Sequence, residues 1–547
     1  MSRYLRTYRD FSGGLSEAAN DNMRDNQLLR AKNVMPGDGY GIARAYGTEI
    51  AYPQVAAGEP VCELIEFKPA NSGSVLVAFT QAAADSQRIY LYDGEEQQWE
   101  NICAATAPLK DWFIQAGKLW WLDGAAIWTY DGSSISEAAI TPAAATPSAA
   151  ELAFWERVKQ ADSVEQRGQR WFYASSVANE LYFSDIGDPT SFELTSIINI
   201  NTKDDDTITA LKEFNEGILI FKRRSVHYLS GWDLAAGTDI KLTQLNVTCG
   251  TAFPRSVKTV ENAVLYLGIN GIYRLYLPSY SYVVAAENIS EYKISSALTE
   301  PGHISEAHAA VWDNAYYLTV VNQQPQYTDG VLDGYTPLRR EFRYLPAYQA
   351  FFGEFTQGAH CYTTALGESG LFLGADNGYI LRYDKSSYHY IHTGEPLYDA
   401  DGELLLASGA PLPIEVTAVS KGFDVAGSMV TDAKLKKAQV VVRQYRAESS
   451  MLSLYISADY HHSGWEMDFD ESLVWDEGEY GEDYWGWKDT LVKEICINNK
   501  AKRLQFTFTD AHLDMPLLIY GVGIIYKKKR PRGSREGVSE KAVVYND

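Results

Sequence analysis

Cysteine is scarce in this chain and follows no recognisable pattern. The five cysteines among 547 residues lie far apart, at Cys62, Cys103, Cys249, Cys361 and Cys496. No two have the spacing of a disulfide framework or of a CxxC metal or redox motif. The sequence therefore argues against a disulfide scaffold. It indicates a protein made in a reducing compartment, whose cysteines serve as small hydrophobic residues.

Long hydrophobic runs are also missing. The first residues, MSRYLRTYRDFSGG, lack the apolar region of a signal peptide, and no stretch of 18 apolar residues occurs. We therefore expect no membrane span, and assembly in a cytosol. If such a protein acts outside the cell, it leaves by a route other than secretion.

Basic residues are fewer than acidic residues in this chain. The chain has 48 Lys and Arg against 71 Asp and Glu, a net charge of −23. Because nucleic-acid affinity comes mainly from cations that neutralise phosphates, this balance argues against a DNA-binding protein. An acidic wall could still line a channel through which DNA slides without sticking. The alternative is that the charge serves solubility alone.

Aromatic residues, by contrast, are abundant, with 37 Tyr and 13 Trp. They recur in pairs of short alternating strands, several of them next to Asp-Gly or similar turns, which is the strongest local signal of a β-hairpin. The pairs are 75–79 with 88–92, 118–122 with 126–130, 217–221 with 225–229, 263–267 with 271–275, and 371–374 with 379–384. Their repeat of roughly 40–50 residues is typical of four-stranded propeller blades. The alternative is a β-sandwich meander.

Changes in composition predict four segments. Residues 1–55 form an N-terminal arm, with a turn or close backbone approach at Gly13-Gly14 and a short helix over 25–33. Residues 56–400 form the β-propeller-like domain. Residues 401–526, with longer strands, form a C-terminal β-sandwich, and 527–547 form a basic tail. The predicted fold class is therefore all-β.

Two stretches interrupt the propeller pattern. Residues 143–167 are rich in Ala and Pro and then helical, with a capping box at Ser148 and Glu151 ahead of Trp155. We expect an insertion or interface element there. Residues 321–340, with Gln-Gln-Pro-Gln and further turn residues, are expected to form a long loop.

The motifs that suggest catalysis are all weak. Asp204, Asp205 and Asp206 lack the spacing of an EF-hand, and the stretch 184–192 resembles a sialidase Asp-box with its register wrong by one residue. His389, His392, His461 and His462 match no zinc pattern. We therefore expect no enzyme, no cofactor and no metal. A paired-carboxylate glycosidase site stays open, because its geometry cannot be deduced from sequence.

Two charged segments are candidates for contacts with partners. The segment 465–489 is dense in acidic residues and contains Trp475, Trp485 and Trp487, which could stack on host sugars. The chain then turns basic near its end, at Lys527, Lys528, Lys529, Arg530 and Arg532. The basic segment could bind DNA, but in so acidic a protein docking on a neighbouring copy is favoured.

Three stretches resemble one protein family. The first is Phe11-Ser12-Gly13-Gly14-Leu15, followed by residues 23–34 and 41–47. The second runs from Leu181 to Phe192 and on through 206–211, 217–222 and 225–231, and the sandwich from Ile414 onward fits more loosely. In this order they resemble the tail-nozzle, or packaged-DNA-stabilisation, proteins of short-tailed bacteriophages. The segments 143–167 and 465–489 depart from the family.

The resemblance implies a structural virion protein. Such proteins are understood to form a six-fold ring at the distal end of the tail, to extend the DNA conduit, to retain the packaged genome and to open for ejection. Expected partners are further copies of the chain, tail adaptor or portal-complex proteins, tail fibres or spikes, and genomic DNA in the lumen, bound without sequence specificity. The expected location is the virion tail, assembled in the host cytoplasm.

The residues expected at an oligomer or partner interface are Phe11, Leu15, Leu28, Leu29, Trp155, Lys527, Lys528, Lys529, Arg530 and Arg532. Two other functions remain open at this point. One is a different connector or hub of the virion, such as an adaptor or head-completion protein. The other is a propeller that binds host glycans.

Overall fold

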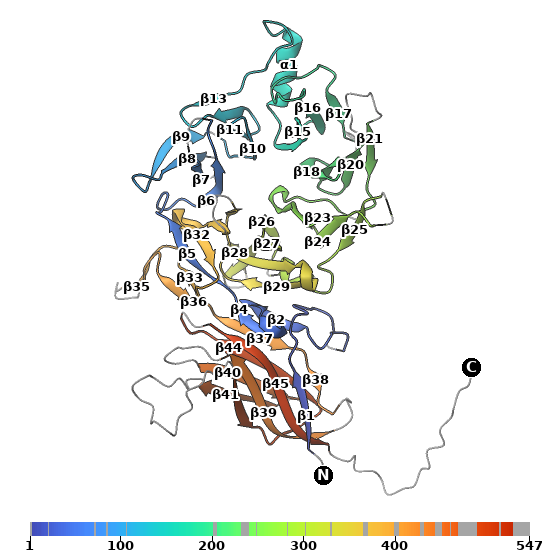
Figure 1. Ribbon diagram of the computed structural model, residues 1–547, viewed down its shortest axis with the longest axis vertical. Helices are drawn as coiled ribbons and strands as arrows, with labels where there is room; N and C mark the ends of the chain where they lie inside the picture. The colour runs from blue at the N-terminus through green and yellow to red at the C-terminus, as the bar shows by residue number, and fades with distance from the viewer. Residues whose placement is uncertain are drawn as a thin grey trace, which may run out of the picture. The chain divides into compact units, whose positions relative to one another are not determined.

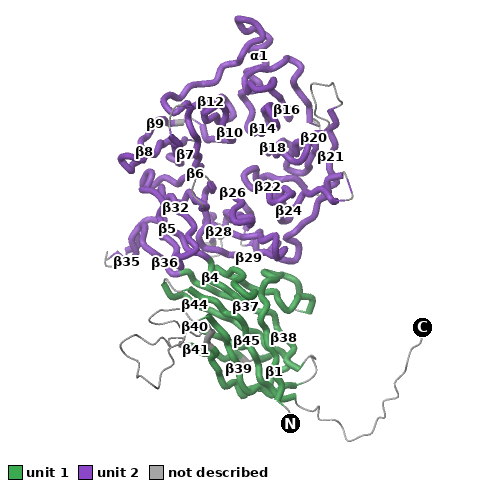
Figure 2. Tube along the Cα trace, in the orientation of Figure 1, with its two compact units in different colours: residues 1–45, 414–547 green, residues 46–413 purple. Residues whose placement is uncertain are grey.

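The computed structural model describes residues 3–19, 21–70, 73–83, 86–105, 107–200, 205–230, 240–247, 249–279, 281, 283–300, 302–328, 331–364, 370–398, 404–426, 432–443, 451–459, 461–468, 490–513 and 516–528. The chain divides into two compact units (Figure 2). Residues 46–413 form one unit, and residues 1–45 together with 414–547 form the other.

The unit 46–413 contains seven four-stranded antiparallel sheets, numbered here as blades 1 to 7. Blade 1 consists of β6 (Val61–Phe67), β7 (Val75–Ala83), β8 (Ser86–Asp93) and β9 (Gln98–Ala105). Blade 2 consists of β10 (Asp111–Gln115), β11 (Lys118–Leu122), β12 (Ile127–Tyr130) and β13 (Ile135–Glu137). Blade 3 consists of β14 (Ser163–Arg167), β15 (Arg170–Ser175), β16 (Glu180–Phe183) and β17 (Ile197–Asn199).

Blades 4 to 7 complete the series. They are β18 (Ile208–Phe214), β19 (Gly217–Lys222), β20 (Val226–Ser230), β21 (Lys241–Gln244); β22 (Lys258–Val260), β23 (Ala263–Gly268), β24 (Gly271–Tyr276), β25 (Ala285–Asn288); β26 (Ile304–Trp312), β27 (Ala315–Thr328), β28 (Val331–Leu345), β29 (Ala350–Phe355); and β30 (Cys361–Thr363), β31 (Phe372–Gly374), β32 (Ile380–Asp384) with β5 (Gly47–Tyr52).

The blades form a closed ring, as Figure 1 shows. First strands of neighbouring blades contact one another: β10 with β14, β14 with β18, β22 with β26, β26 with β30, and β30 with β6. Blade 7 takes its outer strand, β5, from the start of the unit, so both ends of the propeller segment meet in one sheet. The predicted propeller is confirmed, and each of the five predicted hairpins is a pair of adjacent strands within one blade.

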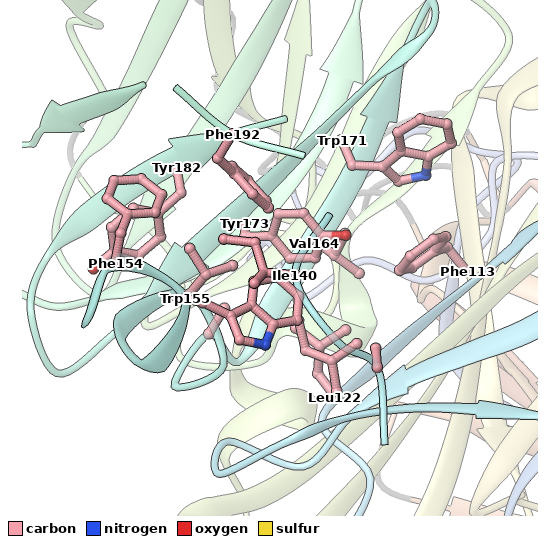
Figure 3. Packing of buried hydrophobic residues seen from close by; sticks show 14 residues of the cluster. Phe113, Leu122, Ile140, Phe154, Trp155, Val164, Trp171, Tyr173, Tyr182 and Phe192 are labelled. Atoms are coloured by element: carbon pink, nitrogen blue, oxygen red, sulfur yellow. The ribbon is translucent and has the colours of Figure 1, made fainter. Parts of the chain in front are cut away.

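Apolar clusters fill the spaces between neighbouring blades. One lies between blades 2 and 3 and includes Phe113, Trp171 and Tyr173 (Figure 3). Others join blades 1 and 2, 3 and 4, 4 and 5, 6 and 7, and 7 and 1. The alternating aromatic residues of the sequence are therefore largely the packing between sheets, because opposite faces of each strand meet different neighbours.

The second unit is a sandwich of two sheets. One has the order β3 (Val34–Pro36), β4 (Ile42–Arg44), β45 (Leu518–Lys528), β39 (Ala433–Arg443), β42 (Thr490–Cys496), with β1 (Tyr4–Tyr8) on β45 and β43 (Lys500–Ala501) on β39. The other has the order β2 (Leu28–Lys32), β37 (Val416–Ser420), β44 (Arg503–Asp510), β40 (Met451–Ala458), β41 (His461–Asp468), with β38 (Phe423–Asp424) on β44.

Two predictions for the N-terminal segment are wrong. Residues 1–45 are not a separate arm, because β1 to β4 pair with strands from the C-terminal third of the chain. The predicted helix over 25–33 is strand β2, paired with β37. A bulge between Leu28 and Arg30 buries Leu28 and Ala31 on the same side, three residues apart, which imitates a helical period.

The close approach expected at Gly13-Gly14 is confirmed. The Gly13 amide donates to the carbonyl of Asn26 at 3.0 Å, and a Cβ at Gly13 would lie 2.6 Å from Asn26 Oδ1. Gly14 has a φ of 64°, a conformation that favours glycine. The Phe11–Leu15 motif therefore fastens the N-terminal segment onto β2.

Two predictions inside the propeller need correction. Residues 149–158 form helix α1 (Ala149–Val158) with the predicted capping box, but residues 163–167 of the proposed insertion are β14 of blade 3. The stretch 321–340 is not a loop, because β27 and β28 pair along it from Tyr316–Tyr344 to Thr328–Val331. Its polar residues belong to a hairpin that extends beyond the other strands of blade 6.

The remaining elements are short. They are the pairs β33 (His389–Ile391) with β36 (Pro411–Pro413) and β34 (Leu397–Tyr398) with β35 (Leu404–Leu406), helix α2 (Ser295–Thr299), and the 3₁₀ turns η1 (Asp38–Tyr40), η2 (Pro254–Ser256), η3 (Pro346–Tyr348) and η4 (Asp376–Gly378). No helix among the described residues is long and apolar enough to cross a membrane.

Candidate functional site at the propeller axis

A polar cavity lies where the first strands of the seven blades converge. Its volume is about 290 Å³, and the residues that line it come from β6, β10, β14, β18, β22, β26 and β30 or from the segments just before them. A volume of this size is enough for several waters. The cavity is therefore the propeller's axial cavity, and it is far too small to pass duplex DNA.

Arg255 closes part of this cavity. It belongs to η2, just before blade 5, and its guanidinium donates to the carbonyl of Cys62 at 3.0 Å and to the carbonyl of Leu109 at 3.3 Å. Its Nη1 also lies 3.4 Å from Glu63 Oε2. Cys62 is in blade 1 and Leu109 precedes blade 2, so one side chain joins opposite sides of a seven-membered ring.

The charges around the cavity balance. Four acidic side chains, Glu63, Asp111, Asp162 and Glu165, face four basic ones, Lys110, Lys212, Arg255 and Lys258, with His308 beside them. Lys212 Nζ lies 2.6 Å from Glu165 Oε1, which links blades 4 and 3. The cavity is therefore not an acidic conduit, and its Lys212–Glu165 and Arg255–Glu63 pairs join different blades.

Burial among these charges shifts several pKa values. It raises the pKa of Asp111 to about 6, against the lowering effect of the Val164 and Trp112 amides, which donate at 2.8 and 2.9 Å. Burial lowers the pKa of Lys258, and it lowers that of His308 well below the ordinary value, helped by Arg255. His308 is therefore neutral near pH 7.

A second ionic cluster, between blades 6 and 7, is fully buried. Arg343 Nε donates to Glu341 Oε1 at 2.7 Å, and both side chains have 0% exposed surface. The hydroxyls of Tyr362 and Tyr383 also donate to Glu341, and Arg343 lies over the ring of Phe355 at 3.9 Å. Burial and the Glu341 carboxylate raise the pKa of both tyrosines well above the ordinary value, so their hydroxyls stay protonated.

Both clusters join neighbouring or opposite blades of the propeller. The described residues contain no group of three or more His, Cys, Asp or Glu side chains arranged to hold a metal ion. The polar residues at the axis and in the Glu341–Arg343 cluster were missed in the sequence analysis. The usable signal was a charged residue interrupting an alternating apolar strand, as in Glu341-Phe342-Arg343-Tyr344.

The predicted interface residues do not gather into one surface. Phe11, Leu15, Leu28 and Trp155 have 1%, 7%, 0% and 3% of their surface exposed, so they are covered by the chain itself. Trp155 packs in the cluster between blades 2 and 3, against Phe192 (Figure 3). Because a covered side chain offers no surface to another subunit, the predicted interface at these four residues is wrong.

The other predicted contact residues divide into two groups. Leu29 is 39% exposed, and Lys527 and Lys528 end strand β45 at the surface of the sandwich unit. Lys529, Arg530, Arg532, Trp475, Trp485 and Trp487 lie outside the described residues. Asp204 also lies outside them, whereas Asp206 accepts from the amide of Arg224 and helps to close a turn.

Comparison with known proteins adds little. No family model matches the chain, and no curated protein matches it. Similar solved structures include the Pan2 WD40 domain of Neurospora crassa, with 12% identity, a TM-score of 0.32, and coverage of 59% of this chain and 89% of that one. Sqt1 of Saccharomyces cerevisiae has 8% identity and a TM-score of 0.37, with coverage of 62% and 99%. The extracellular domain of the putative hybrid two component system BT4673 of B. thetaiotaomicron has 13% identity and a TM-score of 0.31, with coverage of 67% and 58%.

Proposed function

We propose that this protein is a structural component of a bacteriophage tail. In this role, copies of the chain form a ring-shaped nozzle that extends the DNA channel, retains the packaged genome and opens for ejection. The observation that carries the proposal is the order of the three stretches that resemble tail-nozzle proteins. The first of them, Phe11–Leu15, fastens the N-terminal strands into the sandwich unit.

The geometry supports a non-catalytic role in a conduit formed by several copies. The propeller axis is bridged by Arg255 and holds a small, charge-balanced cavity. A DNA channel would therefore run between copies of the chain, not through one propeller. Closed blades with buried ionic links make a rigid module, as the wall of such a channel requires.

The direct test is to locate the protein in virions. Reconstruction of the virion by electron microscopy should find a ring of this chain at the distal end of the tail. Particles assembled without it should lose their DNA after packaging. A ring found at the portal vertex would indicate an adaptor or head-completion role instead. Absence from purified virions would overturn the proposal.

A host-contact role is tested by a separate measurement. If the protein binds host glycans, soluble protein should compete with the virus for adsorption. Replacement of Trp475, Trp485 and Trp487 by alanine should then abolish that competition. In a nozzle without receptor contacts, the same substitutions leave adsorption unchanged.

A further inference from the structure

A row of lysines crosses three strands of the sandwich unit in register. Lys434 on β39 lies directly opposite Lys527 on β45 and also directly opposite Lys500 on β43. Residues directly opposite in antiparallel strands share one face, and neighbouring strands lie about 4.8 Å apart. Three ammonium groups therefore project side by side from one face of the sheet, and we call these three residues the lysine row.

More positive charge surrounds the lysine row. Arg3 directly precedes Tyr4, which pairs with Tyr526 next to Lys527, so Arg3 continues the row onto the neighbouring strand. Lys436 lies two residues beyond Lys434, and proximity to Lys434, followed by burial and by Lys527 and Arg3, lowers its pKa. The chain continues from Lys527 into Lys528-Lys529-Arg530-Pro531-Arg532.

Among the described residues, few acidic side chains lie near this face, although the chain contains 71 of them. Exposed Asp432 directly precedes β39, two residues from Lys434. Glu494 pairs with Lys437 at the border. Within the described part of the chain, Lys434, Lys436, Lys500 and Lys527 have no salt-bridge partner. Like charges placed directly opposite one another destabilise a sheet. The lysine row is therefore unfavourable for the stability of the isolated protein, although the chain has many acidic residues that could neutralise it. This indicates that an anionic partner covers the surface.

The same chain contains a segment of complementary charge. Residues 469–489, between β41 and β42, include eight acidic residues and one lysine. The segment joins β42 at Thr490, which pairs with Arg443. Nine residues of β39 separate Arg443 from Lys434, a distance of about 30 Å at 3.3 Å per residue.

The expectation that copies associate favours a second copy over the same copy as the partner. Asp483 lies seven residues before Thr490, and seven residues span at most about 25 Å. Glu482 lies one residue further from Thr490 than Asp483 does, so a fully extended chain would just span the distance from Thr490 to the lysine row. Asp489, directly before Thr490, therefore cannot reach the lysine row of its own chain, whereas a neighbouring copy can present it without this constraint.

We propose that the lysine row is a docking surface for the acidic segment 469–489 of a second copy of this chain. The contact is head-to-tail, because the two partners use different patches, and such contacts close into rings when the rotation permits. The inference deepens the proposed function, on which it rests for the expectation that copies associate.

Duplex DNA fits this surface less well. DNA is stiff over about 150 base pairs, so a bound duplex would run beyond the patch and across the rest of a protein of net charge −23. A segment of 21 residues can place its charges on the lysine row alone. DNA binding is nevertheless kept as an outcome of the test.

The experiment is a charge swap between two variants of the full chain. The first carries Lys434→Glu and Lys527→Glu, and the second carries Glu482→Lys and Asp483→Lys. Wild type and both variants are examined by mass photometry and sedimentation velocity at low salt and in 0.5 M NaCl. We expect wild type to assemble at low salt and each variant alone to lose at least tenfold in association. An equimolar mixture of the two variants should associate more strongly than either variant alone, because each mixed contact pairs opposite charges at the substituted positions.

A matched control carries Lys118→Glu and Lys241→Glu, two exposed lysines of the propeller, with the same change in net charge. It should assemble like wild type. Circular dichroism and thermal unfolding verify that every variant is folded, and Lys434→Gln with Lys527→Gln gives a milder second test of the row.

Three results would overturn the inference. They are wild type that stays monomeric at low salt, variants that assemble as well as wild type, and row variants that lose only the retention of a labelled DNA duplex. The last result would identify a nucleic-acid surface instead. A ring seen in virions together with unaffected variants would leave the nozzle proposal standing and reject only this contact. Absence from virions would reject the nozzle independently.

Discussion

The guanidinium of Arg255 donates a hydrogen bond to the carbonyl oxygen of Leu109 across the axis of the propeller, at 3.3 Å. The two residues are 146 positions apart, and the same guanidinium also binds blade 1. A single side chain thus holds opposite sides of the ring together. Removal of this side chain should therefore destabilise the whole propeller.

Arg255→Leu should lower the free energy of unfolding by about 2–3 kcal/mol, because two carbonyls lose a charged donor and Glu63 loses a counter-charge. Urea unfolding followed by Trp fluorescence measures the change. Arg255→Lys keeps the charge but not the fork of donors, so it should recover only part of the loss. A Leu variant as stable as wild type would show that the strut contributes nothing.

Arg343→Met should be more damaging, with a loss of about 3–5 kcal/mol, because Glu341 would remain as an uncompensated buried carboxylate. Adding Glu341→Gln removes that charge and should return part of the stability. The double-mutant cycle is read from thermal or urea unfolding. Additive effects of the two substitutions would mean that the side chains are not coupled.

Asp111 makes stability depend on pH. Its pKa is raised by burial to about 6 in the folded protein, above the value of about 3.9 for an unfolded chain. At pH values between these two pKa values, Asp111 is protonated in the folded state and ionised in the unfolded state. This contribution to stability is therefore full below pH 4 and is lost as the pH rises through 6, by at most about 1.4 kcal/mol per pH unit.

The matching variant is Asp111→Asn, which cannot ionise. Relative to wild type, the variant should become more stable as the pH rises from 4 to 7, as measured by the free energy of unfolding. Asp376 has the opposite sign: burial raises its pKa, but the combined effect of His360 and Arg339 outweighs burial and lowers the pKa to about 2, so its contribution is lost on acidification. A constant difference across this range would contradict the role given to Asp111.

The closing sheet of the propeller can be tested through Glu49 and Arg382. These residues lie directly opposite each other on β5 and β32 and form an ion pair. Glu49→Arg should cost about 0.5–1 kcal/mol by placing like charges opposite, and adding Arg382→Glu should restore most of it. Hydrogen exchange of the β32 amides should show faster local opening in the single variant only.

Structural features that depend on residues within about 25 positions of one another were predictable from the sequence. The hairpins of blades 1, 2, 4, 5 and 7 and the Ser148–Glu151 cap depend on neighbours along the chain, so their patterns could be read directly. Strand β2 could not be read, because its partner β37 is almost 400 residues away and a bulge changed its period.

The functional residues were harder to predict for the same reason. Lys434, Lys500 and Lys527 form a row only through the pairing of three distant strands, and only Lys527 stood out, as part of a basic run. The hairpin of β27 and β28 reads as a loop because its polar residues imitate loop composition. Burial of Phe11 and Trp155 likewise depends on tertiary packing that an apolar residue alone does not reveal.

The pairing of distant strands in both units also sets the order in which this chain can be completed during synthesis. Strands β1 and β4 pair with β45, which begins at Leu518, and β5 waits for β32, which begins at Ile380. At 5–20 residues per second, β1 emerges roughly 25–100 s before its partner exists. Every prematurely terminated chain would therefore carry N-terminal strands with unpaired edges, which are targets for proteolysis and aggregation.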